Sequence, residues 1–246
     1  MKGRIRAVKI VWSCLFSLCV GAYAARVLGD TKDTWKKIYD RNDIVVFMKD
    51  PSANGTISVR GEGLLGFSPA EVFSVIENTK RAPEWMPLVK ERRTLEQLDA
   101  TSRIDWTHIG LPWPLRDRYF IDRAQLTKNE QDGTYTISIK SVPEPKKSWL
   151  VDDKVLGFLH YSELTLTPLE GKKTYLTIEV NTDPRGEIPL WMVNLQQRQW
   201  PRKFIEGLRD ELLEDRKKKI QSPQQPSAPE PGQSERSSSA DQPSTK

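Results

Sequence analysis

Cysteine and histidine are scarce in this chain of 246 residues. Its two cysteines, Cys14 and Cys19, both lie in the first 24 residues, and its two histidines are His108 and His160. Residues 25–246 therefore offer no disulfide, no thiolate metal site and no cysteine nucleophile. We expect no metal ion and no cofactor, and we interpret His108 as a hydrogen-bonded residue of the fold. The sequence also lacks a P-loop, a nucleophile elbow and a dinucleotide fingerprint.

An excess of one sign of charge is also missing from most of the chain. The net charge is +5, but four basic residues and no acidic residue lie in the first 24 positions. Without that segment the net charge falls to +1. A nearly neutral body lacks the basic footprint of a nucleic-acid-binding domain, so we expect no nucleic-acid partner.

Residues 1–24 have the three parts of a secretory signal. A basic start is followed by an apolar run at residues 10–20 and then by Ala22-Tyr23-Ala24, a pattern that signal peptidase accepts. The apolar run is shorter than the ~20 residues that span a bilayer. We therefore predict cleavage after Ala24 and export, to the periplasm in a bacterium. An uncleaved anchor that holds the domain at a membrane is the alternative.

The other end of the chain lacks the residues that build a core. Residues 221–246 contain five Pro, seven Ser and five Gln, but no Val, Ile, Leu or aromatic residue. Such a tail buries too little apolar surface to offset its ordering entropy, so we predict that it is disordered. The folded domain is then expected at residues 25–220. A basic run at residues 216–219 precedes the tail, and we interpret it as a solvated helix end. Contact with an anionic membrane is the alternative.

Between these ends, most segments alternate as strands do. We predict a short amphipathic helix at residues 31–40 and a second helix that starts at Ser68, where Glu71 completes a capping box. A long helix is expected at residues 188–218, with a bend at Pro201. Strands are predicted at residues 44–48, 57–65, 88–98, 102–111, 118–128, 134–142, 155–167 and 173–182. The short connections require antiparallel pairing.

These elements indicate an α+β fold in which a curved antiparallel sheet closes around the long terminal helix. The apolar face of that helix is rich in tryptophan, and large aromatic side chains on a bent helix can line an internal space. We predict that Trp191, Leu195 and Trp200 line a tunnel from the helix, and that Trp106 and Ile139 contribute from the sheet. Plain core packing is the alternative for each of them.

Several motifs in a fixed order give the sequence a family resemblance. They are Gly61-Glu62-Gly63, Pro83-Glu84-Trp85, residues 112–120, residues 183–189, Val193-Asn194, Pro201 and Leu208-Arg209. Over about residues 31–215 the chain resembles the START domain, the steroidogenic-acute-regulatory-related lipid transfer domain. The resemblance implies a helix-grip fold, an internal hydrophobic tunnel that holds one lipid, and no catalytic residues.

The resemblance also implies a buried acid and a buried arginine in the tunnel, and by motif position these are Glu91 and Arg118. We expect Arg118 to bind the polar group of the ligand or to pair with Glu91. A structural ion pair, or a solvent-facing Glu91, is the alternative.

The segment at residues 142–150 matches by order the loop that covers the tunnel mouth in the family. We predict that it forms a gate and membrane-docking lip in which Lys146 and Lys147 meet lipid headgroups. Trp149 would enter the interface. The alternative is an ordinary loop whose Trp149 packs back on the body.

The function expected from these observations is binding of one lipid, sterol-like molecule or other hydrophobic ligand, as a carrier or sensor outside the cytoplasm. The protein would act as a monomer with transient membrane contact. An enzyme of the cyclase or hydrolase type, acting on a hydrophobic substrate in the same fold, is the runner-up. A scaffold whose tail binds a partner is a third hypothesis.

Overall fold

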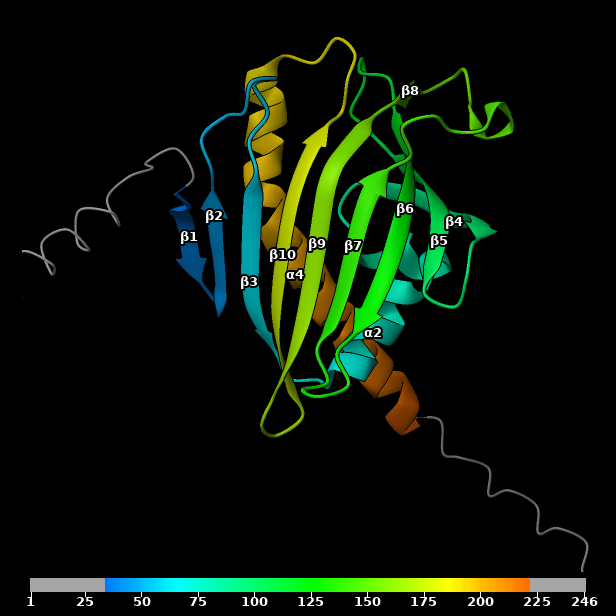
Figure 1. Ribbon diagram of the computed structural model, residues 1–246. Coiled ribbons are helices and arrows are strands. Elements are labelled where there is room, and N and C mark those ends of the chain that lie inside the picture. Colours follow the sequence, from blue (N-terminus) through cyan, green and yellow to red (C-terminus); the bar gives the residue numbers. More distant parts are fainter. Residues whose placement is uncertain (1–33, 222–246) are drawn as a thin grey trace, which may run out of the picture.

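The computed structural model describes residues 34–221. The predicted secretory signal at residues 1–24 lies outside the described residues, as does the predicted tail from residue 222 onward. The described part is one ten-stranded sheet with helices on one of its faces (Figure 1).

The sheet is antiparallel apart from one short strand. Its order is β1-β2-β3-β10-β9-β7-β6-β5-β4, and β8 pairs with β6 in parallel. The strands are β1 (Lys36–Arg41), β2 (Ile44–Met48), β3 (Val59–Leu65), β4 (Val89–Gln97), β5 (Ser102–Ile109), β6 (Arg118–Lys128), β7 (Tyr135–Ser141), β8 (Val155–Leu156), β9 (Phe158–Leu169) and β10 (Lys173–Asp183). The predicted antiparallel sheet is therefore confirmed, and its strands lie close to the predicted ranges.

Three α-helices and two 3₁₀ turns complete the described part. They are α2 (Pro69–Glu77), η1 (Thr79–Arg81), α3 (Ala82–Trp85), η2 (Lys147–Trp149) and α4 (Leu190–Gln221). The predicted capping box begins α2, because the Glu71 N–H donates to Ser68 Oγ at 3.4 Å and the Ser68 N–H donates to the Glu71 carboxylate at 2.8 Å. None of the helices in residues 34–221 has both the length and the apolar character that crossing a membrane requires.

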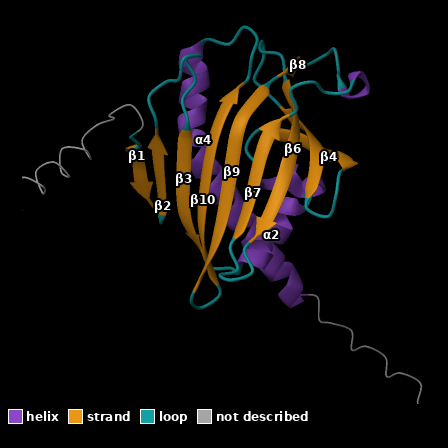
Figure 2. Ribbon diagram, viewed as in Figure 1, coloured by secondary structure: helices purple, strands orange, loops and turns teal. Residues whose placement is uncertain are grey.

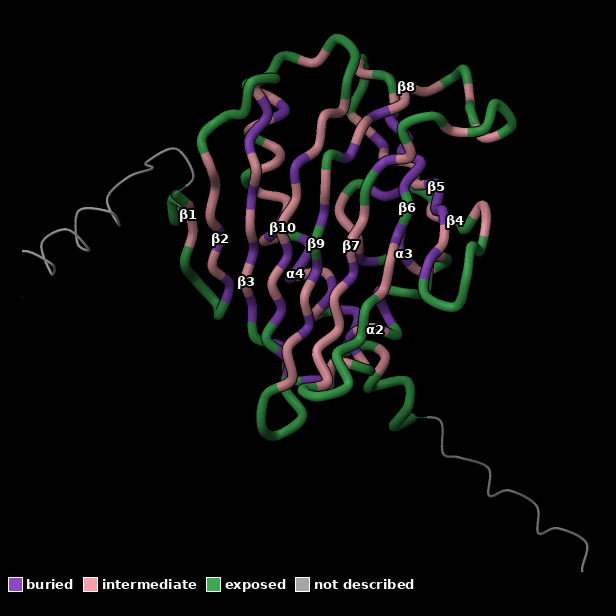
Figure 3. The backbone as a smooth tube through the Cα atoms, in the orientation of Figure 1, coloured by how far each residue is buried: buried purple, intermediate pink, exposed green. Residues whose placement is uncertain are grey.

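Helix α4 and helix α2 lie against the same face of the sheet (Figure 2). Two glycines of β3 allow α4 to approach closely. A Cβ on Gly61 would lie 2.7 Å from Cβ of Pro201, and a Cβ on Gly63 would lie 2.9 Å from Cγ2 of Ile205. The main core fills this interface, and buried residues follow the middle of the strands (Figure 3).

The prediction of a helix at residues 31–40 is wrong. Residues Lys36–Arg41 form strand β1, which pairs with β2. The turn between the two strands is Asn42-Asp43, and both residues have φ near +55°. Two consecutive residues in the left-handed region favour a two-residue hairpin. Sheet pairing therefore overrides the local helical spacing of the apolar residues.

A second, smaller core covers the opposite face of the sheet. Strands β5 and β6 contribute Ile104, Trp106, Tyr119 and Ile121 to it. The connection between β7 and β8 folds over these residues, and Trp149 packs against them together with Val142, Val151 and Leu156. This connection is thereby attached to the outer face of the sheet.

Candidate functional site

A cavity of about 380 Å³ lies between the inner face of the sheet and the first half of α4. Most of its lining is apolar, and most of it comes from strands β4–β7, β9, β10 and helix α4. It includes Val89, Ile109, Phe120, Ile139, Leu159, Val180, Met192, Val193 and Trp200. We call this space the main chamber. Its volume falls in the range of ligand pockets, roughly 300–1,000 Å³.

The main chamber opens between the β5–β6 loop and the start of α4. Leu88, Pro112 and Leu195 line the chamber and are also exposed to solvent. Two tryptophans are neighbours of these lining residues in the sequence. Trp113 follows Pro112 and is 93% exposed, and Trp191 precedes Met192 and is 67% exposed. Single exposed apolar side chains are ordinary, whereas several gathered around one opening mark an interaction surface. We call this opening the mouth.

Buried side chains fasten the loops around the mouth. The Arg118 guanidinium donates hydrogen bonds to the carbonyl oxygens of Pro184 at 3.1 Å and Arg185 at 3.0 Å, and also to that of Arg116. These bonds attach the start of β6 to the loop that precedes α4. Burial of the guanidinium lowers the pKa of Arg118.

Asp117 holds the β5–β6 loop on the other side. Its carboxylate accepts from the Leu111 N–H at 2.8 Å and lies 2.7 Å from Nε2 of His108. These two bonds lower the pKa of Asp117. His108 is therefore hydrogen-bonded within the fold, as the sequence predicted.

A polar cluster closes the inner end of the main chamber. Asp105 accepts from Arg92 at 2.8 Å, from Arg103 at 3.0 Å and from the hydroxyl of Thr94 at 2.9 Å. The side chains of Arg92 and Asp105 are 8% and 3% exposed, so this ion pair is buried. A buried pair of this kind is held by its additional hydrogen bonds.

Asp122 is a second buried carboxyl group in the same wall. It lines the main chamber and accepts from the hydroxyl of Ser141 at 2.7 Å. Burial raises the pKa of Asp122 to about 6, against a smaller lowering by Ser141 and Arg92. The inner end therefore combines the buried Arg92–Asp105 ion pair with a second carboxyl group, Asp122, whose pKa is raised to about 6.

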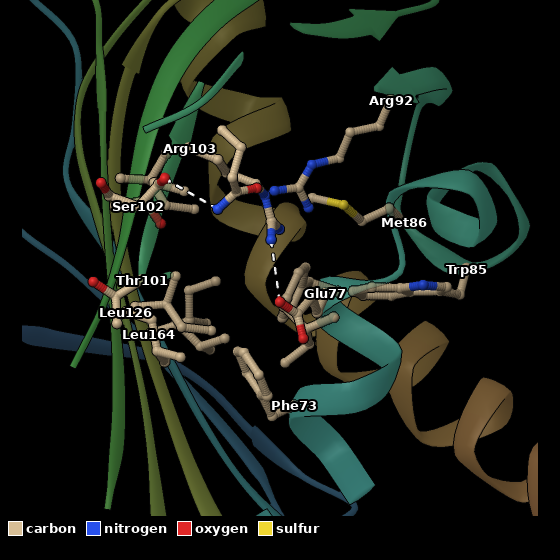
Figure 4. Close-up of a pocket in the computed structure, with 18 of the residues that line it drawn as sticks. Phe73, Glu77, Trp85, Met86, Arg92, Thr101, Ser102, Arg103, Leu126 and Leu164 are labelled. Carbon is tan, nitrogen blue, oxygen red and sulfur yellow. Dashed lines mark hydrogen bonds and ion pairs between the residues drawn. The ribbon is translucent and has the colours of Figure 1, made fainter. Parts of the chain in front are cut away.

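A smaller cavity of about 80 Å³ adjoins the main chamber beyond Arg92. Six residues line both spaces: Met86, Arg92, Ala124, Ile139, Ser162 and Trp200. Phe73 and Glu77 of α2 and the β4–β5 turn form the far wall (Figure 4). We call this space the small chamber.

Two predicted site residues lie outside both chambers. Glu91 is half-exposed and pairs with Arg93 at 2.9 Å, so the prediction that it pairs with Arg118 is wrong. Trp106 is buried in the second core, and the guanidinium of Arg93 lies 4.4 Å from its ring centre. Its predicted place in the tunnel lining is therefore also wrong.

Four of the five remaining predicted tunnel residues line the main chamber, and one lies outside it. Arg118, Ile139, Leu195 and Trp200 line the main chamber, and their contact with a ligand stays a prediction. Trp191 does not line it but is exposed beside the mouth, which corrects the prediction.

The predicted lip lies away from the mouth. Lys146 pairs with Glu96 and its Nζ lies 4.6 Å from the ring centre of Trp149, which packs on the second core. None of Lys146, Lys147 and Trp149 lines either chamber. The prediction of a gate in this loop is therefore wrong, and the alternative, in which Trp149 packs back on the body, is confirmed.

Sequence reasoning missed the polar cluster because of strand register. The β4–β5 pairing shifts between Val89 and Glu91, so strict alternation from residue 88 gives the wrong face, and Arg92 points inward in place of Glu91. Asp122 could have been found. It alternates with Phe120 and Ala124 on the inner face of β6, and a charged residue on an apolar face is a signal in itself.

The comparisons with known proteins agree with this architecture. The START domain family model matches residues 24–208. An uncharacterized protein of Pseudomonas aeruginosa is 27% identical over 183 residues, which cover 72% of this chain and 86% of that protein.

Two solved structures share the fold. The STAR-related lipid transfer protein from Xanthomonas axonopodis is 24% identical, with a TM-score of 0.65 over 74% of this chain and 99% of that chain. Human StAR-related lipid transfer protein 5 is 22% identical, with a TM-score of 0.65 over 84% of this chain and 99% of that chain.

Proposed function

We propose, on the premise that the chain belongs to the START domain family, that it carries one single-chain lipid or similarly compact apolar molecule between membranes. Members of this family generally bind lipids or other hydrophobic ligands. The observation that carries the proposal is the main chamber, a mostly apolar space of about 380 Å³ whose charged lining residues lie at its inner end and near its mouth.

The size of the chamber favours a small ligand. Its volume of about 380 Å³ lies near the lower end of the range of ligand pockets, roughly 300–1,000 Å³. A chamber of this size suits one acyl chain better than a phospholipid with two long chains. Arg92, Asp122 and Ser162 would meet the polar end of the chain at the inner wall.

The physical task is to keep the chain out of water. Each exposed methylene group costs ~0.8 kcal/mol, so a chain of a dozen carbons costs on the order of 10 kcal/mol in free solution. An apolar chamber lowers this barrier while the molecule crosses an aqueous space.

We also propose that the mouth, and not the loop at residues 142–150, meets the bilayer. Trp113, Trp191, Leu88, Leu190 and Leu195 are large apolar residues exposed around it. Tryptophan suits the membrane interface because it has an apolar body and one polar N–H. The occupant of this surface is a lipid bilayer, because the surface is continuous with the opening through which a lipid would enter.

The first test is extraction of the purified protein with organic solvent, followed by mass spectrometry. We expect about one single-chain or compact lipid per molecule. An empty extract from several expression hosts would argue strongly against a lipid carrier.

The second test measures transfer of a fluorescent single-chain lipid between vesicles. The double variant Trp113→Ala, Trp191→Ala should slow transfer at least tenfold while its melting temperature stays close to that of the wild type, because both side chains are exposed. The matched control is Lys146→Glu, Lys147→Glu, which should leave transfer unchanged. The opposite result would place the docking surface back on the 142–150 loop.

We further propose that the protein is exported by the segment at residues 1–24. A basic start, a short apolar run and Ala22-Tyr23-Ala24 support this. The intact mass of the protein from its native host tests it directly. A mature chain that begins at Ala25 is expected, and a full-length chain in the membrane fraction would favour the uncleaved anchor.

An enzyme acting on the bound lipid is the second candidate, and Asp122 is the observation that favours it. A buried carboxyl group with a pKa of about 6 could serve as a general acid or base. Asp122 is, however, already hydrogen-bonded by Ser141. Incubation of the loaded protein at pH 5–8, followed by mass spectrometry of the ligand, distinguishes the two functions, because a carrier returns the lipid unaltered.

A further inference from the structure

We infer that the small chamber is a headgroup site: it takes the anionic headgroup of a single-chain amphiphile whose chain lies in the main chamber, and Arg103 holds that headgroup in exchange for Glu77. The inference rests on the proposed function, because it needs a lipid in the main chamber. It adds the chemical class and the orientation of that lipid.

The two chambers adjoin at a narrow divide. Arg92 and Met86 reach into it from the β4 side (Figure 4). Trp200 of α4 lines both chambers as well. Arg92 is fixed by Asp105 at 2.8 Å, whereas methionine is an adaptable side chain with three rotatable bonds. Movement of Met86 would therefore join the two spaces without disturbing the ion pair.

The small chamber reaches the surface at its far end. Four of its lining residues, Glu77, Gln97, Ala100 and Thr101, are exposed to solvent. They lie at the end of α2 and in the β4–β5 turn, on the side of the cavity away from the mouth residues. The rest of its lining is mostly apolar and includes Phe73 and Leu164 (Figure 4). The chamber thus changes from apolar to wet along its length.

One ion pair bridges this second opening. Nη1 of Arg103 lies 3.4 Å from Oε1 of Glu77, and the Glu77 side chain is about half-exposed (Figure 4). Exposed pairs of this kind contribute little, so Glu77 is easily displaced. Arg103 also donates to both oxygens of Asp105 at 3.0 Å, which keeps its guanidinium in place when Glu77 leaves.

The charges favour an anionic oxygen over other headgroups. A charged group in an apolar space is expensive unless it is paired or hydrated. The small chamber offers both solutions: the Arg103 guanidinium for pairing and an opening to water. Replacement of the Glu77 carboxylate by a ligand phosphate or carboxylate also keeps Arg103 between two anions, as it is now.

The sizes of the two spaces agree with this orientation. The small chamber, at about 80 Å³, is much smaller than the main chamber, at about 380 Å³, so it suits a compact headgroup whose outer part projects into water. The main chamber then takes the single chain.

The experiment compares two probes with the same chain, dodecyl phosphate and dodecanol, by isothermal titration calorimetry. The wild type should bind dodecyl phosphate at least tenfold tighter than dodecanol. Glu77→Gln, which frees Arg103, should raise the affinity for dodecyl phosphate about threefold or more and leave the affinity for dodecanol unchanged. Arg103→Gln should remove the preference for dodecyl phosphate without changing the affinity for dodecanol. Arg103→Lys should restore part of that preference.

Glu91→Gln is the matched control, because it removes an exposed carboxylate from an ion pair with Arg93 outside both chambers. It should change neither affinity. Inorganic phosphate alone should bind at least a hundredfold more weakly than dodecyl phosphate, since a free anion gains nothing from the main chamber. Tight binding of phosphate alone would overturn the lipid class and identify a simple anion site.

The outcomes separate this inference from the proposed function. Equal affinity of the wild type for the two probes, or no response of dodecyl phosphate to Glu77→Gln, would overturn the headgroup site while binding of dodecanol still supports a lipid carrier. Binding of neither probe would overturn both.

Discussion

Asp122 shows how the burial of a single side chain changes its pKa. Its carboxyl group lines an apolar chamber, and its pKa is raised to about 6 by that burial. An ordinary aspartate in an unfolded chain titrates near 3.9. The folded state therefore binds a proton more tightly than the unfolded state between these two values. Stability that is present below pH 4 is lost as the pH rises through 6.

Asp122→Asn should accordingly stabilise the protein at neutral pH. The amide mimics the protonated carboxyl group and keeps an oxygen that accepts from Ser141. A shift of about two pKa units corresponds to a gain of roughly 1–3 kcal/mol in the free energy of unfolding at pH 7.5. The gain should vanish near pH 4. Urea denaturation at both pH values measures it, and an equal gain at both would show that the charge of Asp122 is not the cause.

Single residues also show how far the candidate site could be predicted from the sequence. The motif positions that the family resemblance supplied identified Arg118, which lies on the inward face of β6. They failed on β4, where one shift in register exchanges Glu91 for Arg92. A bulge depends on pairing with the neighbouring strand, and hydrophobic alternation does not encode it. The headgroup-facing residues of β4 and β5 were therefore beyond prediction from pattern.

Among the secondary-structure elements, the contact between β3 and α4 holds the terminal helix close against the sheet. Gly61→Ala should destabilise the fold by about 1–3 kcal/mol, because the added Cβ would lie 2.7 Å from Pro201 Cβ and 3.2 Å from Ile205 Cδ1. Gly66→Ala is the matched control, since no heavy atom lies within 4 Å of its added Cβ. Thermal denaturation of both variants measures the difference. Similar stabilities would mean that α4 can move outward at no cost.

The β7–β8 connection offers a second test at the level of elements. Trp149→Ala should lower the free energy of unfolding by about 1–3 kcal/mol, because Trp149 packs on the second core. Lipid transfer per folded molecule should stay unchanged, since the residue lines neither chamber. Lys147→Ala, at an exposed position of the same turn, serves as the control. Slow transfer with unchanged stability would instead assign this loop to the membrane.

For the whole molecule, the sequence predicted the architecture more accurately than the candidate site. The strands, the capped helix α2 and the long helix α4 follow from alternation, capping and spacing, which are local signals. The edge strand β1 did not, because its state depends on pairing with β2. The mouth was misplaced for the same reason: only the folded chain brings the β5–β6 loop beside the start of α4.

The volume enclosed by the whole fold predicts which lipids stabilise it. A ligand that binds only the folded state adds about 2.7 kcal/mol when its free concentration is a hundred times its dissociation constant. For a domain of this size that gain raises the melting temperature by about 5–10 °C. Dodecanol or dodecyl phosphate, with one chain matched to the main chamber of about 380 Å³, should produce this rise. A phosphatidylcholine with two long chains, supplied in vesicles, should produce none. An equal rise with the two-chain lipid would mean that the sheet and α4 separate to enlarge the chamber, and the single-chain class would then be wrong.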